Sequence, residues 1–360
     1  MATTRESPLP ILATTQESPL PKSTLSPFTL VNSVFLMVGS GGAALLLRIY
    51  FIHGGQRIWL SSFLQVAGWP LLLLPLSFSA KKFNLSLFIY SVFTFIGIFW
   101  ALDSYLYALA SSLLPLSTSS LVICSQLAFT AVSAFLLVRQ RFTPYSFNAV
   151  VLLTIGPAVL TLGEGSDRPE GESKGKYIFG LLMAVAAAAL AGFIFATMEL
   201  VMRRGKVVQT YAAAIEMQLA ISISGSVFCL IGMIINNDFQ AIQREAREFG
   251  LGRTKYFMVL IWDAVFWQLS TIGLIGLVSG ASSLFVSVMI ALTLPLIEIL
   301  AVIFLHEKFS ASKGIALVLS IWGFISYLYG EKRQSDKAKK VAQQEPVTRA
   351  ENELSANELT

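Results

Sequence analysis

The sequence predicts an all-α polytopic membrane protein, built from ten transmembrane helices that form two inverted five-helix repeats. Three observations support this fold class. Hydrophobic residues make up 55% of the 360 residues and charged residues only 13%, whereas soluble proteins average about 25% charged residues. Apolar stretches of about 20 residues, which is long enough to cross a bilayer, recur from Thr29 to Tyr329. Similar short motifs also occur in the fourth and ninth of these stretches.

Glycine, proline and charge clusters divide the apolar region into segments. The predicted transmembrane helices are residues 29–50, 58–79, 86–107, 113–138, 145–163, 177–202, 210–235, 257–278, 282–305 and 313–329. The first five-helix repeat then covers 29–163 and the second covers 177–329, with a loop at 164–176. Residues 1–28 contain much Ser, Thr and Pro, and residues 330–360 are highly charged, so both tails are predicted to be disordered.

Lysine and arginine in the loops orient these helices. With both tails in the cytoplasm, the basic residues on the cytoplasmic side are Lys81, Lys82, Arg139, Arg141, Arg203, Arg204, Lys206, Lys332 and Arg333. The opposite side also carries basic residues in the loop 236–255, so the positive-inside signal is modest. The sequence predicts a multi-pass protein, placed in the plasma membrane, with both termini cytoplasmic.

The evidence for a repeat is a pair of similar fragments. The fourth segment contains SSL at 119–121 and ends in VRQRF, and the ninth contains SSL at 282–284 and ends in LHEKF. Matching both fragments requires about one helical turn of slippage, and chance similarity between apolar helices is the alternative explanation. Five spans per repeat would invert the two halves in the membrane, an arrangement of transporters that bind their substrate near the midplane.

The loop 236–255 has its own helical pattern. Within FQAIQREAREFG, Phe239, Ile242, Ala246 and Phe249 recur at helical spacing. This pattern favours an amphipathic helix lying at the membrane interface, and a solvated helical loop is the alternative.

Several polar residues occur inside the predicted spans, where a charged side chain costs about 2.5–3.5 kcal/mol on insertion scales. Arg48, Asp103 and Glu199 are near helix ends and can reach the interface. The polar residues that lie deeper are Gln126, Glu216, Gln218, Asp263, Gln268 and Glu298. Deep carboxyl groups are candidates for proton coupling, and amides are candidates for ligand binding or for hydrogen bonds between helices.

The stretch WDAVFWQL combines several of these groups. Asp263 and Trp267 are four residues apart and share a helix face, with Ser270 beside them. An indole beside hydrogen-bonding groups suits a flat, nitrogen-containing ring, through stacking or cation–π attraction. An interfacial tryptophan beside a partly solvated aspartate is the alternative.

The sequence gives little support for other classes of function. The two histidines, His53 and His306, lie at span ends, and no zinc, nucleotide-binding or serine-hydrolase motif is present. Cys124 and Cys229 lie in apolar runs, so we expect small packed residues. We therefore predict no enzyme activity, no cofactor or metal, and no nucleic-acid partner; the partners are a small molecule and the lipid bilayer.

Six fragments follow one another in collinear order over about 31–329, namely RIYFIHGGQRIWLSSFLQVAGWP, LPLSTSSLVICSQLAFT, FTPYSFNAVVLL, IEMQ, VFWQ and AVIFLHEKF. Together these fragments resemble the plant purine permease family, which belongs to the drug/metabolite transporter superfamily. The resemblance implies ten helices in two inverted repeats and proton-coupled uptake of purine bases and related compounds such as adenine and cytokinins. Some members of the family move alkaloids or pyridoxine-type vitamins, which is the alternative within transport. A polytopic receptor that binds without transporting is the alternative from another class.

The family motifs also mark candidate residues. Gln126, Glu216, Gln218, Trp267 and Gln268 lie on stretches typical of the family, as do Asp103, Tyr107 and Glu199; Asp263 and Glu298 are not recognised as standard features and could mark a preference for cationic ligands. The predicted substrate-binding residues are Tyr107, Gln126, Gln218, Asp263, Trp267 and Gln268. The predicted proton-coupling residues are Asp103, Glu199, Glu216 and Glu298. The proton gradient would drive uptake.

Overall fold

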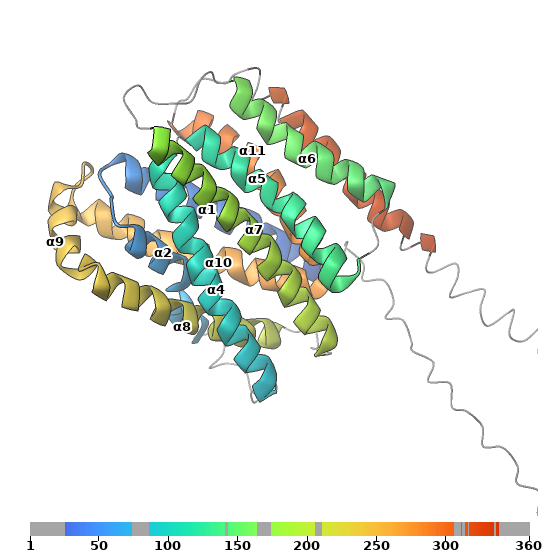
Figure 1. Cartoon of the computed structure of the whole chain (residues 1–360), viewed down its shortest axis with the longest axis horizontal. Coiled ribbons are helices and arrows are strands. Elements are labelled where there is room, and N and C mark those ends of the chain that lie inside the picture. Colours follow the sequence, from blue (N-terminus) through green and yellow to red (C-terminus); the bar gives the residue numbers. More distant parts are fainter. Residues whose placement is uncertain are drawn as a thin grey trace, which may run out of the picture.

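The computed structural model is helical throughout the residues that it describes, and no strand occurs among them (Figure 1). Those residues are 26–73, 86–114, 116–140, 143–163, 174–205, 211–305, 311, 314–315, 317–334 and 336–337. The first half of the chain contains α1 (Pro27–Ile52), α2 (Ile58–Val66), η1 (Trp69–Leu72), α4 (Leu87–Leu113), α5 (Leu116–Ser133), η2 (Ala134–Val138) and α6 (Pro144–Gly163). The second half contains α7 (Lys174–Arg204), α8 (Tyr211–Ile235), α9 (Asp238–Glu248), α10 (Arg253–Gly280) and α11 (Ser283–Leu305).

Five of the described helices are long and apolar enough to cross a membrane. They are residues 27–52, 87–113, 175–204, 212–235 and 253–280. Each coincides with one of the predicted spans, so the all-helical membrane architecture is confirmed. The other predicted spans contain shorter helical stretches, and the total of ten crossings and the inverted repeat stay predictions.

The second predicted span differs from its prediction. Instead of one helix from 58 onward, α2 ends at Val66 and the 3₁₀ helix η1 begins at Trp69. Pro70 explains the break, because its ring removes a backbone N–H and clashes with the preceding helical turn. Gln65 lies in the last turn of α2, directly before this break.

Close helix packing fixes the centre of the molecule. α1 and α10 run antiparallel and in contact over much of their length. Gly39 of α1 faces the backbone of Ser270, and Gly273 of α10 faces the backbone of Leu36. Small residues at these positions let two backbones approach closely, as is typical of helix pairs in membranes. α4 packs beside both α7 and α8.

The short helix α9 covers the end of the bundle at which α8 ends and α10 begins, at the left of Figure 1. The helix predicted in this loop is therefore confirmed. Part of its apolar side packs on the protein. Ala246, and Phe249 directly after the helix, are buried against Tyr50 of α1 and Tyr256 of α10. Phe239 is half exposed. The amphipathic pattern thus reflects packing on the protein itself.

Candidate ligand-binding site

A cavity of about 150 Å³ lies between the long helices. Its walls come from α1, α2, α4, α5, α7, α10 and α11. The aromatic rings of Trp100, Phe195 and Trp267 supply flat apolar surfaces. On α7 the wall consists of small side chains, namely Ala184, Ala187, Ala188 and Ala191. A cavity of roughly this size in another protein accepts a benzene molecule, so the space suits a small ring compound.

Three buried polar atoms in this cavity wall have no hydrogen-bond partner among the described residues. They are Nε2 of Gln65, Oδ1 of Asp103 and Nε1 of Trp267. Gln65 as a whole is only 5% exposed. A buried polar group without a partner is unfavourable, so these side chains are candidates to turn toward a ligand in the cavity. Together they offer two N–H donors and a carboxyl group.

Four of the predicted site residues line the cavity. Asp103 and Tyr107 face it from α4, Gln126 from α5 and Trp267 from α10. Ser270, the predicted neighbour of Trp267, also lines it. The cavity therefore brings together residues that the sequence placed on three separate spans.

Gln65, Trp100 and Phe195 were not among the predicted site residues. Gln65 lies within LQVAGW, one of the fragments that resemble the purine permeases, but its polarity alone did not distinguish it from other residues of that fragment. Trp100 and Phe195 are tilted against each other at a centroid distance of 5.8 Å. Their sequence signal was only that of aromatic residues in apolar helices.

Asp263 and Gln268 lie on α10 beside Trp267 but not in the cavity lining. Asp263 is 1% exposed, and neither carboxyl oxygen has a partner among the described residues. Tyr107 is close enough to interact electrostatically with both Asp263 and Asp103. Asp263 thus lies near Tyr107 and outside the cavity lining, while Gln268 packs against Gly68 in the turn after α2.

Glu216 and Gln218 on α8 also lie outside the cavity lining. The Tyr90 hydroxyl donates to the Glu216 carboxylate at 3.2 Å. The Gln218 amide donates to the Ser222 hydroxyl at 2.9 Å, one turn along the same helix. Both side chains are buried, and in this conformation their contacts connect or support helices.

Glu199 takes part in a polar network at the end of the bundle opposite α9. Its carboxylate accepts hydrogen bonds from the backbone N–H of Ser283 at 2.6 Å and from the Ser283 hydroxyl at 2.5 Å. It also forms an ion pair with Arg203, one turn later on α7. Glu199 therefore holds the end of α7 against the start of α11. Glu298 lies within α11, but its side chain is outside the described residues.

No group of three or more His, Cys, Asp or Glu side chains that could hold a metal ion occurs among the described residues. A bundle of apolar helices around a cavity with aromatic walls and a few inward polar groups is typical of a membrane protein that binds a small, flat molecule. This is the class of protein that the fold and the site define.

Comparison with known proteins defines the family. A family model described as purine nucleobase transmembrane transport matches residues 28–337. Purine permease 3 of Arabidopsis thaliana is 41% identical over 339 residues, which cover 91% of this chain and 97% of that protein. Purine permease 2 of the same plant is 40% identical over 336 residues, covering 86% and 93% respectively. The chain therefore belongs to the purine permease family of multi-pass membrane transporters.

A solved crystal structure has a similar fold, with a TM-score of 0.61. The match covers 84% of this chain and 99% of the solved chain at 15% sequence identity. At that identity the likeness describes the fold alone.

Proposed function

We propose that this protein is a proton-coupled uptake transporter for purine bases and related planar nitrogen heterocycles, such as adenine and cytokinins. The observation that carries the proposal is the cavity of about 150 Å³, with its aromatic walls and unpartnered polar atoms. Family membership supports the same class of substrate. Uptake from outside the cell requires the plasma membrane, and the basic residues of the predicted cytoplasmic loops support an orientation with both termini in the cytoplasm.

A purine ring matches the chemistry of the cavity. The indole rings of Trp100 and Trp267 can contact the faces of the ring, while Nε2 of Gln65 can donate a hydrogen bond to a ring nitrogen. The Asp103 carboxyl can accept a hydrogen bond from an exocyclic N–H group. Gln126 is 9% exposed and lines the same space, where its amide can either donate or accept.

Asp103 is our choice for the coupling proton. Among the described residues it is the acidic one in the cavity lining, so the proton and the substrate would meet in one space. A carboxyl group that faces the solution on alternate sides can bind a proton on one side and release it on the other. Glu199 binds Ser283 and Arg203, and Glu216 binds Tyr90. Either glutamate would first have to leave these partners before it could carry a proton.

Uptake into yeast cells that express the protein tests this function. We expect radiolabelled adenine to accumulate above its external concentration, faster at acidic than at neutral external pH, and to fall to the equilibrium level when an uncoupler collapses the proton gradient. Accumulation that persists with the uncoupler would rule out proton coupling. Binding without any accumulation would instead support the receptor alternative.

An alkaloid or vitamin carrier is the alternative within the same mechanism. The cavity volume favours compounds of one or two fused rings over a benzylisoquinoline. A competition panel of adenine, a cytokinin, pyridoxine, nicotine and a benzylisoquinoline would rank these compounds. Stronger competition by nicotine or the benzylisoquinoline than by adenine would replace purines as the proposed substrates.

A further inference from the structure

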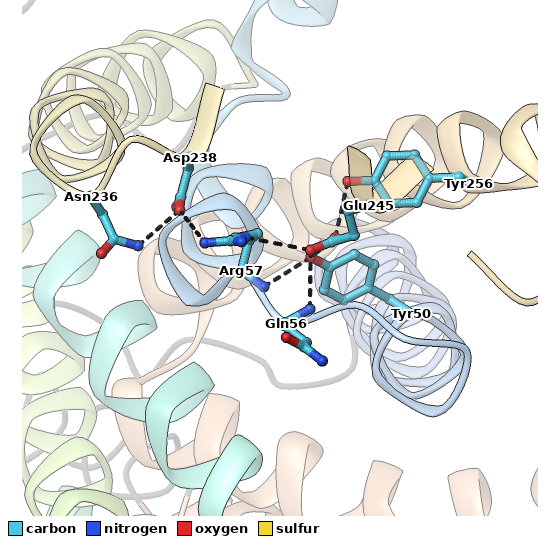
Figure 2. Close-up of polar contacts among 7 residues, drawn as sticks. All are labelled: Tyr50, Gln56, Arg57, Asn236, Asp238, Glu245 and Tyr256. Carbon is cyan, nitrogen blue, oxygen red and sulfur yellow. Dashed lines mark hydrogen bonds and ion pairs between the residues drawn. The ribbon is translucent and has the colours of Figure 1, made fainter. Parts of the chain in front are cut away.

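A cluster of charged and tyrosine side chains joins the turn between α1 and α2 to α9 (Figure 2). Arg57, directly before α2, lies between two carboxylates of α9. Its Nη1 is 3.6 Å from Oδ1 of Asp238, and its Nε is 3.6 Å from Oε2 of Glu245. Both carboxylates are almost fully buried, whereas a quarter of the Arg57 side chain is exposed.

Glu245 is the centre of this cluster. Its Oε1 accepts hydrogen bonds from the hydroxyl of Tyr50 at 2.6 Å and from that of Tyr256 at 3.1 Å. Its Oε2 accepts from the backbone N–H of Gln56 at 3.3 Å. The Tyr50 hydroxyl in turn accepts from the backbone N–H of Arg57 at 3.2 Å. Residues of α1, α9, α10 and the α1–α2 turn therefore meet at one carboxylate, as Figure 2 shows.

Arg57 is the weakest member of the cluster. Its two contacts at 3.6 Å are longer than the 2.7–2.9 Å of a charge-assisted hydrogen bond, and its Nε has no hydrogen-bond partner among the described residues. Electrostatic attraction therefore holds the Arg57 guanidinium against the two carboxylates, while its backbone N–H is hydrogen-bonded to the Tyr50 hydroxyl. The tyrosine hydrogen bonds to Glu245 do not depend on the guanidinium.

The α2 helix connects this cluster to the cavity. Two residues after Arg57, the ring of Trp59 stacks on Tyr105 of α4 with centroids 4.1 Å apart. Gln65, in the last turn of the same helix, lines the cavity. From Arg57 to Gln65 the helix rises only about 12 Å. A shift of Arg57 would thus move both a contact with α4 and a polar group of the cavity.

We propose that Arg57, Asp238 and Glu245 form a clasp that closes the α9 end of the transporter, with Arg57 as its positioning residue. The contacts of this clasp break whenever the cavity opens to that side. The proposal rests on the transport function proposed above, since an alternating carrier must open and close each end. The Glu199 network occupies the opposite end, and both sets of contacts are formed together in this structure. Opening to the α9 side would separate Arg57 from Glu245 and leave the Glu199 network intact.

Thiol labelling from the α9 side tests the clasp. The parent protein carries Cys124→Ser, Cys229→Ala and a reporter cysteine, Ser111→Cys, because Ser111 lines the cavity near the α9 end of α4. We expect Arg57→Gln to raise the rate of labelling by a membrane-impermeant maleimide several-fold. Arg57→Lys, which keeps the charge, should leave the rate closer to that of the parent.

Arg253→Gln is the matched control. Arg253 is exposed at the same end of the bundle and bonds only to Gln243 among the described contacts, so its loss should not change the labelling rate. Equal labelling in the parent, Arg57→Gln and Arg253→Gln would overturn the clasp. So would an equal increase in both arginine variants, because any lost charge would then have the same effect.

Two further measurements separate the possible failures. Thermal unfolding in detergent shows whether Arg57→Gln still folds. If it does not, Asp238→Asn, which removes the outer carboxylate only, is labelled in its place, and its labelling rate must also exceed that of the parent. Labelling requires no substrate, so a failure of adenine uptake with faster labelling of Arg57→Gln would reject the proposed substrate and keep the clasp. Normal adenine uptake with an unchanged labelling rate of Arg57→Gln would reject the clasp and keep the proposed substrate.

Discussion

Gln65 is a direct test of how the cavity recognises a ligand, because its buried amide donor has no protein partner among the described residues. Replacing it with leucine keeps most of the volume and removes the donor. A neutral hydrogen bond contributes about 1 kcal/mol, which corresponds to roughly a fivefold rise in KM for adenine. Initial uptake rates measure this change. Gln243→Leu, an exposed amide change, is the control, and an unchanged KM for Gln65→Leu would remove Gln65 from the site.

Asp103 gives a test that separates coupling from binding. If its carboxyl carries the proton, Asp103→Asn can still exchange substrate across the membrane but cannot use the proton gradient. We expect accumulation of adenine to fall to about the equilibrium level, while exchange of labelled for unlabelled adenine continues. If gradient-driven accumulation is lost in Glu216→Gln but not in Asp103→Asn, the coupling proton is carried by Glu216 on α8 and not by Asp103.

Asp238 gives a pH-dependent prediction outside the spanning helices. Burial raises the pKa of its carboxyl above the ordinary aspartate value, although Asn236 and Arg57 act in the opposite direction. The folded protein thus binds this proton more tightly than the unfolded chain does. The resulting stabilisation is complete below the unfolded pKa, about 3.9, and is lost as the pH rises through the folded pKa.

The comparison of Asp238→Asn with the wild type measures this effect. From about pH 4 to about pH 7, the melting temperature of the wild type in detergent should fall relative to that of the variant. A difference between the two proteins that does not change with pH would contradict the raised pKa.

The residues of the site show what a sequence can predict. Asp103, Gln126 and Trp267 stand out because polar groups and indoles are unusual in apolar helices, and all three line the cavity. Asp263 gives an equally strong signal, yet it is not among the residues that line the cavity. Helical spacing tells which residues share a face, but only the packing of neighbouring helices decides where that face meets a cavity.

At the scale of the elements, the α1–α10 pair depends on close backbone approach. A Cβ atom at Gly273 would lie 2.5 Å from the backbone N of Leu36 and 2.6 Å from the carbonyl oxygen of Asn32. We expect Gly273→Ala to destabilise the protein by about 1–3 kcal/mol through overpacking, measured as a lower melting temperature. Gly250→Ala is the control, since the nearest atoms to its Cβ would be 3.5 Å away. Equal melting temperatures would show that the two helices can separate at little cost.

The breaks between elements were harder to predict than the elements themselves. Five apolar spans were correctly placed because their length and composition are characteristic of membrane helices. The end of α2 before Pro70 was missed, because the apolar run continues through the proline. The α9 helix was predicted from its spacing, but its partners Tyr50 and Tyr256 are distant in sequence. A periodic pattern predicts which side chains of a helix are buried, but it does not predict which residues they contact.

At the scale of the whole molecule, each end of the bundle is held by an arginine–carboxylate pair together with hydrogen bonds to the same buried carboxylate. At one end the Glu199 carboxylate binds the first residue of α11 and its neighbour Arg203. At the other end a partly exposed arginine sits between two carboxylates. A transport cycle would break and re-form these contacts in turn, with the aromatic cavity between them.

Because Arg57 is partly open to the solution, dissolved ions can screen its attraction to Glu245, and from the other side they can screen the Arg203–Glu199 pair, whose arginine is more exposed. The buried hydrogen bonds of Tyr50 to Glu245 and of Ser283 to Glu199 are shielded from these ions. Raising the salt concentration on one side alone should therefore loosen only the end that faces that side. A carrier built in this way responds separately to the ionic strength of each compartment, so the mineral content of the fluid on either side of the membrane sets how readily that end opens.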